Sequence, residues 1–180
     1  MDIINGIKTR RSIRSFKDEA ISKETIAQIV DTAAFAPSWK NSQTTRYTAI
    51  FNKDIKERLA NDCMQGFTYN TNTVNGAPCV VVVSTVNGRS GYERDGSPTT
   101  SKGTHWQSFD AGIATQTFCL AAHEAGLGTV IMGIFDEAKV AELLSLPEGQ
   151  SVSALIAIGY PNDTPDAPKR KTSAELLSSK

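Results

Sequence analysis

A chain of 180 residues is long enough for one domain with a sizeable core, and its 39% apolar and 21% charged residues are typical of a globular protein. The 19 basic and 19 acidic residues cancel, which argues against nucleic acid as the main partner, because proteins that bind it usually carry a net basic face. No apolar run approaches the length that a bilayer requires, and the N-terminal residues do not resemble a signal peptide. We therefore expect a single cytoplasmic domain over residues 1–180, without a membrane partner.

Helical and strand patterns alternate along the chain. The first clear helix begins at Ser22, a suitable N-cap, and its apolar stripe ends before Pro37. Residues 77–83 contain four consecutive valines, and such a run without alternation indicates a central strand buried on both faces. In chain order we expect a helix at 22–36, a loop at 38–43, a strand at 47–51, a helix at 53–64, a strand at 77–83, a loop at 87–104, a helix at 105–125, a strand at 129–134, a helix at 136–144 and a strand at 153–158.

Three of these segments suggest more than a scaffold. A loop as long as residues 87–104 is usually functional in a compact domain. The helix at 105–125 is apolar or small on nearly every face, which predicts burial, and burying so long a helix often requires a partner subunit. The tail from Pro161 onward is rich in proline and charge, so we expect it to lie over a surface. The alternation predicts a sandwich with helices on both sides of one sheet.

Basic residues gather near both ends of a chain that has no net charge. Arg10, Arg11 and Arg14 lie around Ser12, and Lys169-Arg170-Lys171 lies close to the C-terminus. The planar donor fork of arginine suits a phosphate, to which lysine adds a mobile point charge. A phosphorylated ligand is the first hypothesis. The alternative is that both clusters are solvated surface charge.

The usual catalytic signatures do not occur in the sequence. There is no Gly-x-Ser-x-Gly elbow, no Walker loop and no Gly-x-Gly-x-x-Gly after a strand. Two histidines and three widely spaced cysteines leave little material for a triad or a zinc site, so we expect no metal. Such a protein leaves its chemistry to a cofactor. The roughly −1.5 to −2 charges of a mononucleotide phosphate would suit two or three basic contacts.

Several short motifs together resemble the flavin-dependent nitroreductases. In the order of that family the chain carries residues 10–16, then Ala36-Pro37-Ser38 with Asn41 and Gln43, then residues 126–129, 158–161 and 168–171. The resemblance spans residue 3 to about residue 177 and depends on the joint order of the motifs. It implies an α+β three-layer sandwich, with a central, mostly antiparallel β-sheet flanked by helices, in an intertwined homodimer that binds FMN at the subunit interface. It also implies an oxidoreductase in which NADH or NADPH reduces the flavin, which then reduces a nitroaromatic, quinone or related small-molecule acceptor.

The resemblance assigns roles to individual residues. Arg14 is expected near the flavin N1–O2 edge as the catalytic cation, because hydride addition at N5 leaves negative charge there. The residues expected to contact the FMN phosphate and ribityl chain are Arg10, Arg11, Ser12, Lys169, Arg170 and Lys171. Those expected along the ring are Pro37, Ser38 and Asn41 from the second subunit, Asn70 (or Asn72) at the N3–O4 edge, and Met132, Gly133 and Ile134, whose backbone could bond N5.

Three alternatives remain open at this point. One is a reductive dehalogenase-type member of the same fold, and another is a flavin-binding sensor or storage module. The third is an interaction domain without cofactor, in which both basic clusters are solvated. The sequence decides neither between NADH and NADPH nor which acceptor is physiological, and Trp39 could either stack on a substrate or pack at an interface.

Overall fold

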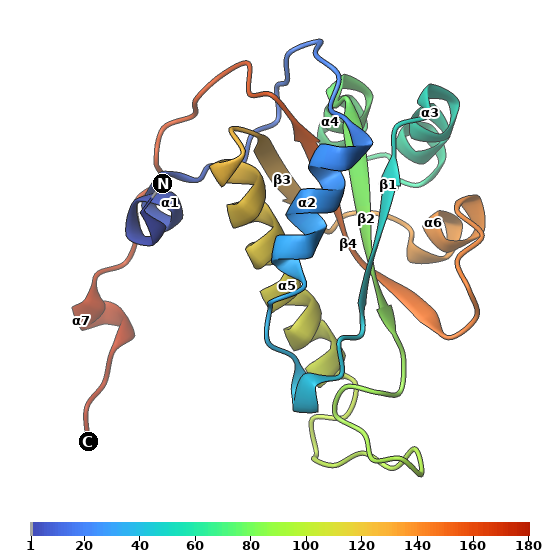
Figure 1. Cartoon of the computed structure of the whole chain (residues 1–180), viewed down its shortest axis with the longest axis vertical. Helices are drawn as coiled ribbons and strands as arrows, with labels where there is room; N and C mark the ends of the chain where they lie inside the picture. The colour runs from blue at the N-terminus through green and yellow to red at the C-terminus, as the bar shows by residue number, and fades with distance from the viewer. Residues whose placement is uncertain (1) are drawn as a thin grey trace.

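The valine-rich segment forms the interior of the sheet. It is strand β2 (Cys79–Val86), and its residues are buried from Cys79 to Thr85, which confirms the prediction. In the computed structural model, which describes residues 2–180, the strand order is β1-β2-β4-β3 (Figure 1). The other strands are β1 (Thr45–Ile50), β3 (Gly128–Met132) and β4 (Gln150–Gly159), and every pairing is antiparallel.

Helices cover both faces of this sheet. On one face, α2 (Lys23–Ala33) and α5 (His105–Glu124) pack against Val81 and Val83 of β2. On the other, α3 (Lys53–Asp62), α4 (Thr68–Gly76) and α6 (Glu137–Leu143) pack against Val80 and Val82. Alternate valines therefore belong to different clusters, as the two-residue period of a strand requires. The predicted α+β three-layer sandwich is confirmed.

Helix α2 begins at its predicted cap, and α3 begins at a cap that was not predicted. The Ser22 hydroxyl accepts a hydrogen bond from Thr25 N at 3.0 Å, and the Asn52 amide oxygen accepts one from Ile55 N at 3.0 Å. Helix α2 ends at Ala33, earlier than predicted, because the chain turns there before Pro37. Three helices were not predicted: α1 (Ile3–Thr9), α4 and α7 (Ser173–Leu176).

Helix α5 is buried on one side only in the single chain. Ala111, Ala114 and Phe118 face the sheet, whereas Phe109 is 58% exposed and Gln116 is exposed. Among residues 2–180 no layer covers its far side, so the predicted burial of nearly all of its surface would need a partner subunit and stays a prediction. Helix α1 lies beside its C-terminal end, and the loop at 87–104 extends from its N-terminal end (Figure 1).

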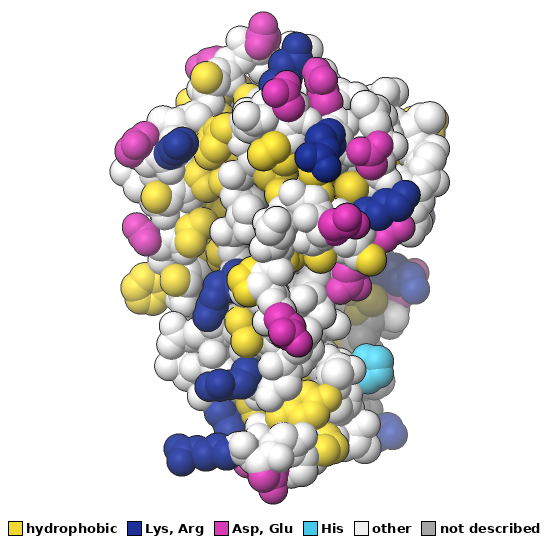
Figure 2. All heavy atoms as spheres, turned by 90° about the vertical axis from the view of Figure 1, so that its right-hand side faces the viewer, with side chains coloured by type: hydrophobic (Ala, Val, Ile, Leu, Met, Phe, Trp, Pro, Cys, Tyr) yellow, Lys and Arg dark blue, Asp and Glu magenta, His cyan; other side chains and the backbone are white. Residues whose placement is uncertain are grey.

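The tail after Pro161 contributes nothing to the core. It runs past α1 and through the short helix α7, away from the sheet (Figure 1), and its residues from 166 onward are exposed, so in the single chain they do not cover the surface that was predicted for them. On the face of the molecule that carries α3 and α6, acidic and basic side chains are interspersed over the upper half (Figure 2). Within residues 2–180, no helix has both the length and the apolar character that crossing a membrane demands.

Candidate functional site

The N-terminal basic segment is fixed to the edge of the sheet. Ser12 forms a parallel bridge with Thr129 of β3, and Ile13 N donates to Thr129 O at 3.0 Å. A Cβ on Gly128 would lie 2.6 Å from Ile13 Cγ1 and 2.7 Å from Ile13 Cβ, so only glycine permits this approach. The Gly126-Leu127-Gly128 turn therefore follows the end of α5 and lets the basic segment pack against the start of β3.

The three arginines of this segment differ in their surroundings. The Arg11 guanidinium donates to the carbonyls of Lys8 at 2.7 Å and Arg10 at 2.9 Å, so part of its fork closes the end of α1. Arg14 is exposed and donates to Ser12 O at 3.3 Å. The guanidinium of Arg10 is half-buried and makes no hydrogen bond to any residue between 2 and 180, so its donors are available to a ligand.

A pocket of about 170 Å³ opens beside this segment, lined by Thr9, Arg10, Arg11, Ile13, His123, Gly126, Leu127, Gly128, Pro161, Asp163 and Thr164. Across it, His123 Nε2 lies 2.9 Å from Thr9 Oγ1. Burial lowers the pKa of His123, the positive charge of Arg10 lowers it further, and Glu124 opposes both effects. His123 is not among the site residues that the sequence predicted. Its contact with α1, 114 residues away in sequence, gave no local signal.

The second set of predicted ring contacts lies at the end of β3. Asn70 Nδ2 donates to Ile134 O at 3.0 Å, which brings α4 and this strand end together. The Met132 side chain is buried in the core, while Gly133 and Ile134 are exposed. Apart from the Ser12–Thr129 bridge, the outer edge of β3 pairs with no other described residue. The backbone groups on that edge are therefore open to a ligand.

The third group, Pro37, Ser38 and Asn41, lies on a different part of the molecule. It surrounds the 3-10 turn η1 (Trp39–Asn41), whose Trp39 N donates to Asp110 Oδ2 at 2.9 Å. Asp110 lies near the N-terminal end of α5, whereas the His123 contact to the basic segment lies near its C-terminal end. Thirteen residues of helix correspond to about 20 Å. One chain therefore does not bring these groups together.

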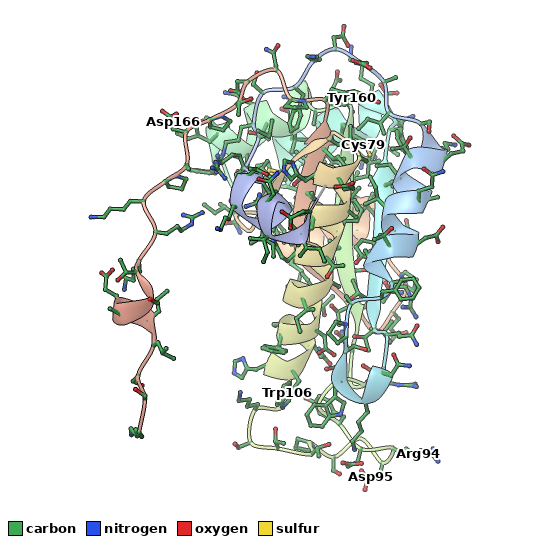
Figure 3. All side chains as sticks on the ribbon, turned by 60° about the vertical axis from the view of Figure 1, so that its left-hand side comes forward. Cys79, Arg94, Asp95, Trp106, Tyr160 and Asp166 are labelled. Carbon is green, nitrogen blue, oxygen red and sulfur yellow. The ribbon has the colours of Figure 1, made fainter. Side chains whose placement is uncertain are left out.

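The basic residues of the tail also stay apart from the arginines. Lys169, Arg170 and Lys171 are exposed, and no hydrogen bond or ion pair joins them to another of the residues from 2 to 180. Asp166 of the tail and the loop residues Arg94 and Asp95 lie at opposite ends of the molecule (Figure 3). Only the first part of the tail, at Asp163 and Thr164, borders the pocket of Arg10.

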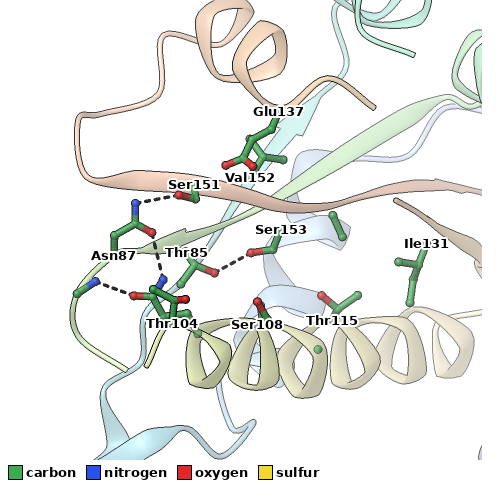
Figure 4. A pocket seen from close by; sticks show the side chains of 15 residues that line it. Thr85, Asn87, Thr104, Ser108, Thr115, Ile131, Glu137, Ser151, Val152 and Ser153 are labelled. Atoms are coloured by element: carbon green, nitrogen blue, oxygen red, sulfur yellow. Dashed lines mark hydrogen bonds between the residues drawn. The ribbon is translucent and has the colours of Figure 1, made fainter. Parts of the chain in front are cut away.

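A hollow of about 700 Å³ on the surface contains none of the predicted site residues. It lies between α5 and the adjoining parts of β2 and β4 (Figure 4). Its polar lining is largely paired with itself: Thr85 Oγ1 and Ser153 Oγ lie 2.8 Å apart, and Asn87 Nδ2 donates to Ser151 Oγ at 2.8 Å. Size alone therefore does not locate the chemistry.

The cysteines are core residues: Cys63, Cys79 and Cys119 are all free and buried. Burial raises the pKa of Cys79 to about 12 against the opposing effect of Lys56, and it also raises the pKa of Cys63 and of Cys119. Burial and the raised pKa both disfavour the thiolate, which argues against a nucleophilic role for these residues.

Comparison with known proteins identifies the family that the chain resembles in sequence and structure. The sequence matches the profile of the Nitroreductase family over residues 7–73 and 68–160. It is 31% identical over 169 residues to a protein of Methanothermobacter thermautotrophicus designated NADH dehydrogenase/NAD(P)H nitroreductase, covering 92% of this chain and 80% of that one. It is 28% identical over 171 residues to an FMN reductase [NAD(P)H] of Bacillus subtilis, covering 90% of this chain and 67% of the other.

A solved structure agrees with both sequence matches. A protein of Desulfovibrio desulfuricans, described as a nitroreductase in complex with FMN, is 30% identical with a TM-score of 0.79. The alignment covers 100% of this chain and 97% of that one. The predicted resemblance is thereby confirmed, and the chain is an enzyme that belongs to the nitroreductase family.

Proposed function

We propose that this protein is an FMN-dependent oxidoreductase that takes electrons from NADH or NADPH and reduces nitroaromatics, quinones or related small molecules. The observation that carries this proposal is the fixed basic segment, with the unengaged guanidinium of Arg10, beside the open edge of β3. The FMN complex of the Desulfovibrio protein and the FMN reductase of Bacillus subtilis support the same cofactor.

The residues present fit a flavin mononucleotide. Arg10 and Ser12 would hold the phosphate, because they lie together at the start of the segment that Gly128 seats. The exposed backbone at Gly133 and Ile134 would lie along the ring, with the amide of Asn70 at their side. When bound, FMN supplies the redox chemistry that none of these side chains can perform.

The chain's own contribution to the reaction is electrostatic. Arg14 is exposed and held only by the carbonyl of Ser12, so its guanidinium can turn toward the pyrimidine edge of the ring. A fixed cation there stabilises the negative charge that reduction leaves on the ring. Arg14 would accordingly act on the rate and potential more than on cofactor retention.

We infer that the complete site needs two copies of the chain. The Arg10 segment and the Ser38 loop lie near opposite ends of α5, so a second copy would supply whichever group the first lacks. The exposed surface supports a homodimer, because large apolar side chains of α1, α5 and the tail face outward. They are Ile3, Ile4, Ile7, Phe109, Leu176 and Leu177.

The first experiment is an absorption spectrum of the purified protein, followed by anaerobic addition of NADH and, separately, NADPH. The proposal expects a flavin spectrum that one donor bleaches and that a nitroaromatic or quinone restores. A bound flavin that neither donor reduces would favour a sensor or storage role. No flavin, even after incubation with FMN, would contradict the proposal altogether.

Subunit complementation tests whether the site is shared. One variant carries Arg10→Ala and Arg14→Ala, the other Ser38→Ala and Asn41→Ala, and the two are co-expressed with different tags. A shared site predicts that the mixed dimer regains close to half of the wild-type activity, because one of its two sites is then intact. If both groups acted within a single chain, every site would remain defective and activity would not return.

A further inference from the structure

The loop that carries Ser38 and Asn41 has an unusual backbone. In this interface loop, defined as residues 37–44, Lys40, Asn41 and Gln43 have φ values of 46°, 56° and 48°. They are three of the five non-glycine residues with positive φ among residues 2–180. Left-handed backbone is unfavourable for such residues and persists only where the surroundings impose it. Something outside the loop must therefore hold its shape.

Asp110 is the buried polar group that holds the start of this loop. The residue is 3% exposed, and one carboxylate oxygen, Oδ2, accepts from Trp39 N at 2.9 Å and from Ser90 Oγ at 2.7 Å. Within the loop, Gln43 N donates to Ser38 Oγ at 3.0 Å, which closes the turn on itself. At the surface, Lys40 pairs with Glu93 at 3.1 Å, but an exposed pair of this kind contributes little. Asp110 thus fixes the start of the interface loop to α5.

The same carboxylate fixes the loop at 87–104. Ser90 is fully buried, and a Cβ on its neighbour Gly91 would lie 2.8 Å from both Gly103 O and a ring carbon of Trp106. Trp106 in turn packs on Trp39 with ring centroids 4.7 Å apart. The two loops are therefore one packed unit, in which Asp110 makes the buried polar contacts and the Lys40–Glu93 pair an exposed one.

Unsatisfied polar atoms concentrate in the interface loop. Trp39 Nε1, Ser42 Oγ and Thr44 Oγ1 are buried and find no hydrogen-bond partner within residues 2–180. Buried polar groups are nearly always paired, so three exceptions within six residues distinguish this loop from the rest of residues 2–180 and add to the cost of its strained backbone.

We propose that Asp110 is a positioning residue of the flavin site. Through Trp39 N and Ser90 Oγ it holds the interface loop in the strained shape that presents Ser38 and Asn41 to the flavin on the second copy of the chain. The proposal rests on the proposed function, and it adds that Asp110 couples the loop at 87–104 to the proposed flavin contact. Asparagine at this position would keep an acceptor oxygen in place, whereas alanine would remove it.

The test measures FMN binding and the visible circular dichroism of the bound flavin in Asp110→Ala, Asp110→Asn and Ser90→Ala. Asp31→Ala, which changes an exposed carboxylate on α2, is the matched control. We expect Asp110→Ala to raise the FMN dissociation constant at least tenfold and to change the flavin dichroism. Asp110→Asn should stay within threefold of wild type, Ser90→Ala should lie between them, and the far-ultraviolet spectra should not change.

Each result decides for or against the proposal. Wild-type affinity and dichroism in Asp110→Ala would overturn it, and so would equal losses in the Asn and Ala variants. If Asp110→Ala does not fold, unchanged affinity and dichroism in Ser90→Ala would overturn it instead. Failure of the wild-type protein to bind FMN is a separate result, which counts against the proposed function rather than against the role of Asp110.

Discussion

Asp110 and His123 lie thirteen residues apart on α5, and each holds one of the two segments from which we propose the flavin site is built. Asp110 binds the backbone of Trp39 at one end, and His123 lies 2.9 Å from Thr9 Oγ1 at the other. The helix therefore sets a spacing of about 20 Å between the two segments within one chain. If both segments contact one flavin, as we propose, that spacing requires a second copy of the chain.

Arg10→Ala should weaken FMN binding through loss of a phosphate contact. A hydrogen bond to a charged group contributes about 1.5–3 kcal/mol, which corresponds to about a 10- to 150-fold rise in the dissociation constant. Titrating the apoprotein with FMN and with riboflavin measures this directly, because riboflavin lacks the phosphate. Riboflavin binding should not change, and Arg58→Ala on α3 should match wild type for both ligands. Equal losses for the two ligands would show that Arg10 does not contact the phosphate.

Arg14→Ala should slow reduction of the flavin more than it weakens FMN binding. The reason is that charge at the pyrimidine edge develops on reduction, so the cation acts mainly after the cofactor has bound. Anaerobic stopped-flow bleaching by the preferred donor should slow by about tenfold or more. Arg14→Lys should restore part of the rate. Proportional losses in rate and affinity would instead assign Arg14 to anchoring.

The double variant Lys169→Ala with Lys171→Ala should lower FMN affinity and flatten its dependence on salt. Mobile lysines act through long-range charge, which salt screens over a Debye length of about 10 Å at 0.1 M. The dissociation constant is measured between low and moderate salt, with Lys23→Ala plus Lys139→Ala as the control for net charge. Wild-type affinity and salt slope in the tail variant would remove the tail from the phosphate site.

Gly128→Ala should destabilise the fold and loosen the basic segment. The new Cβ would meet Ile13 Cγ1 at 2.6 Å, and overpacking of this kind costs about 1–3 kcal/mol. Urea unfolding of the apoprotein gives the free energy. Gly76→Ala, at the end of α4 with open space around it, should be neutral or slightly stabilising. If Gly128→Ala had the wild-type free energy of unfolding, the Ile13 side chain would be able to move aside at little cost, and the prediction would be wrong.

His123 should make the stability of the apoprotein depend on pH. Burial and the charge of Arg10 lower its pKa in the folded protein, so the unfolded chain binds more protons near the ordinary histidine pKa of about 6.5. His123 should therefore contribute its full share to the free energy of unfolding above about pH 7. This contribution should be lost as the pH falls through 6.5 toward the lowered pKa of the folded protein. His123→Gln should remove this slope, whereas His105→Gln, on an exposed residue, should keep it. Identical slopes in both variants would contradict the assignment.

The sequence predicted the layered fold well because periodicity and caps are local signals. The four valines located the central strand, and Ser22 located the start of α2. Helices α1 and α4 were missed because glycine, asparagine and threonine give them little intrinsic propensity. Tertiary contacts stabilise α4: Thr71 Oγ1, for example, donates to Ala60 O at 3.1 Å.

The candidate site was predictable only in part. The order of the motifs identified the arginines, the Ser38 loop and the tail as site segments. It did not show which of these segments would come from the same copy of the chain in one site. The contacts of Asp110 could not be predicted from the sequence, because its partners Trp39 and Ser90 lie 71 and 20 residues away. Long-range side-chain contacts of this kind leave no period and no spacing in a single sequence.

The loop at 87–104 has a property that bears on how acceptor range could diverge. Its ends are packed at Ser90 and Trp106, while its middle closes on itself through Glu93 N to Ser97 O and Thr99 N to Gly91 O, each at 2.9 Å. Glu93, at the start of this hairpin, also pairs with Lys40 of the interface loop at 3.1 Å. The turn from Arg94 to Gly96 is the part of the loop that can change length or composition while Ser90, Glu93 and Trp106 keep their contacts with the interface loop. On the proposed function, variation in that turn would alter the acceptor range without changing the residues proposed to hold the cofactor.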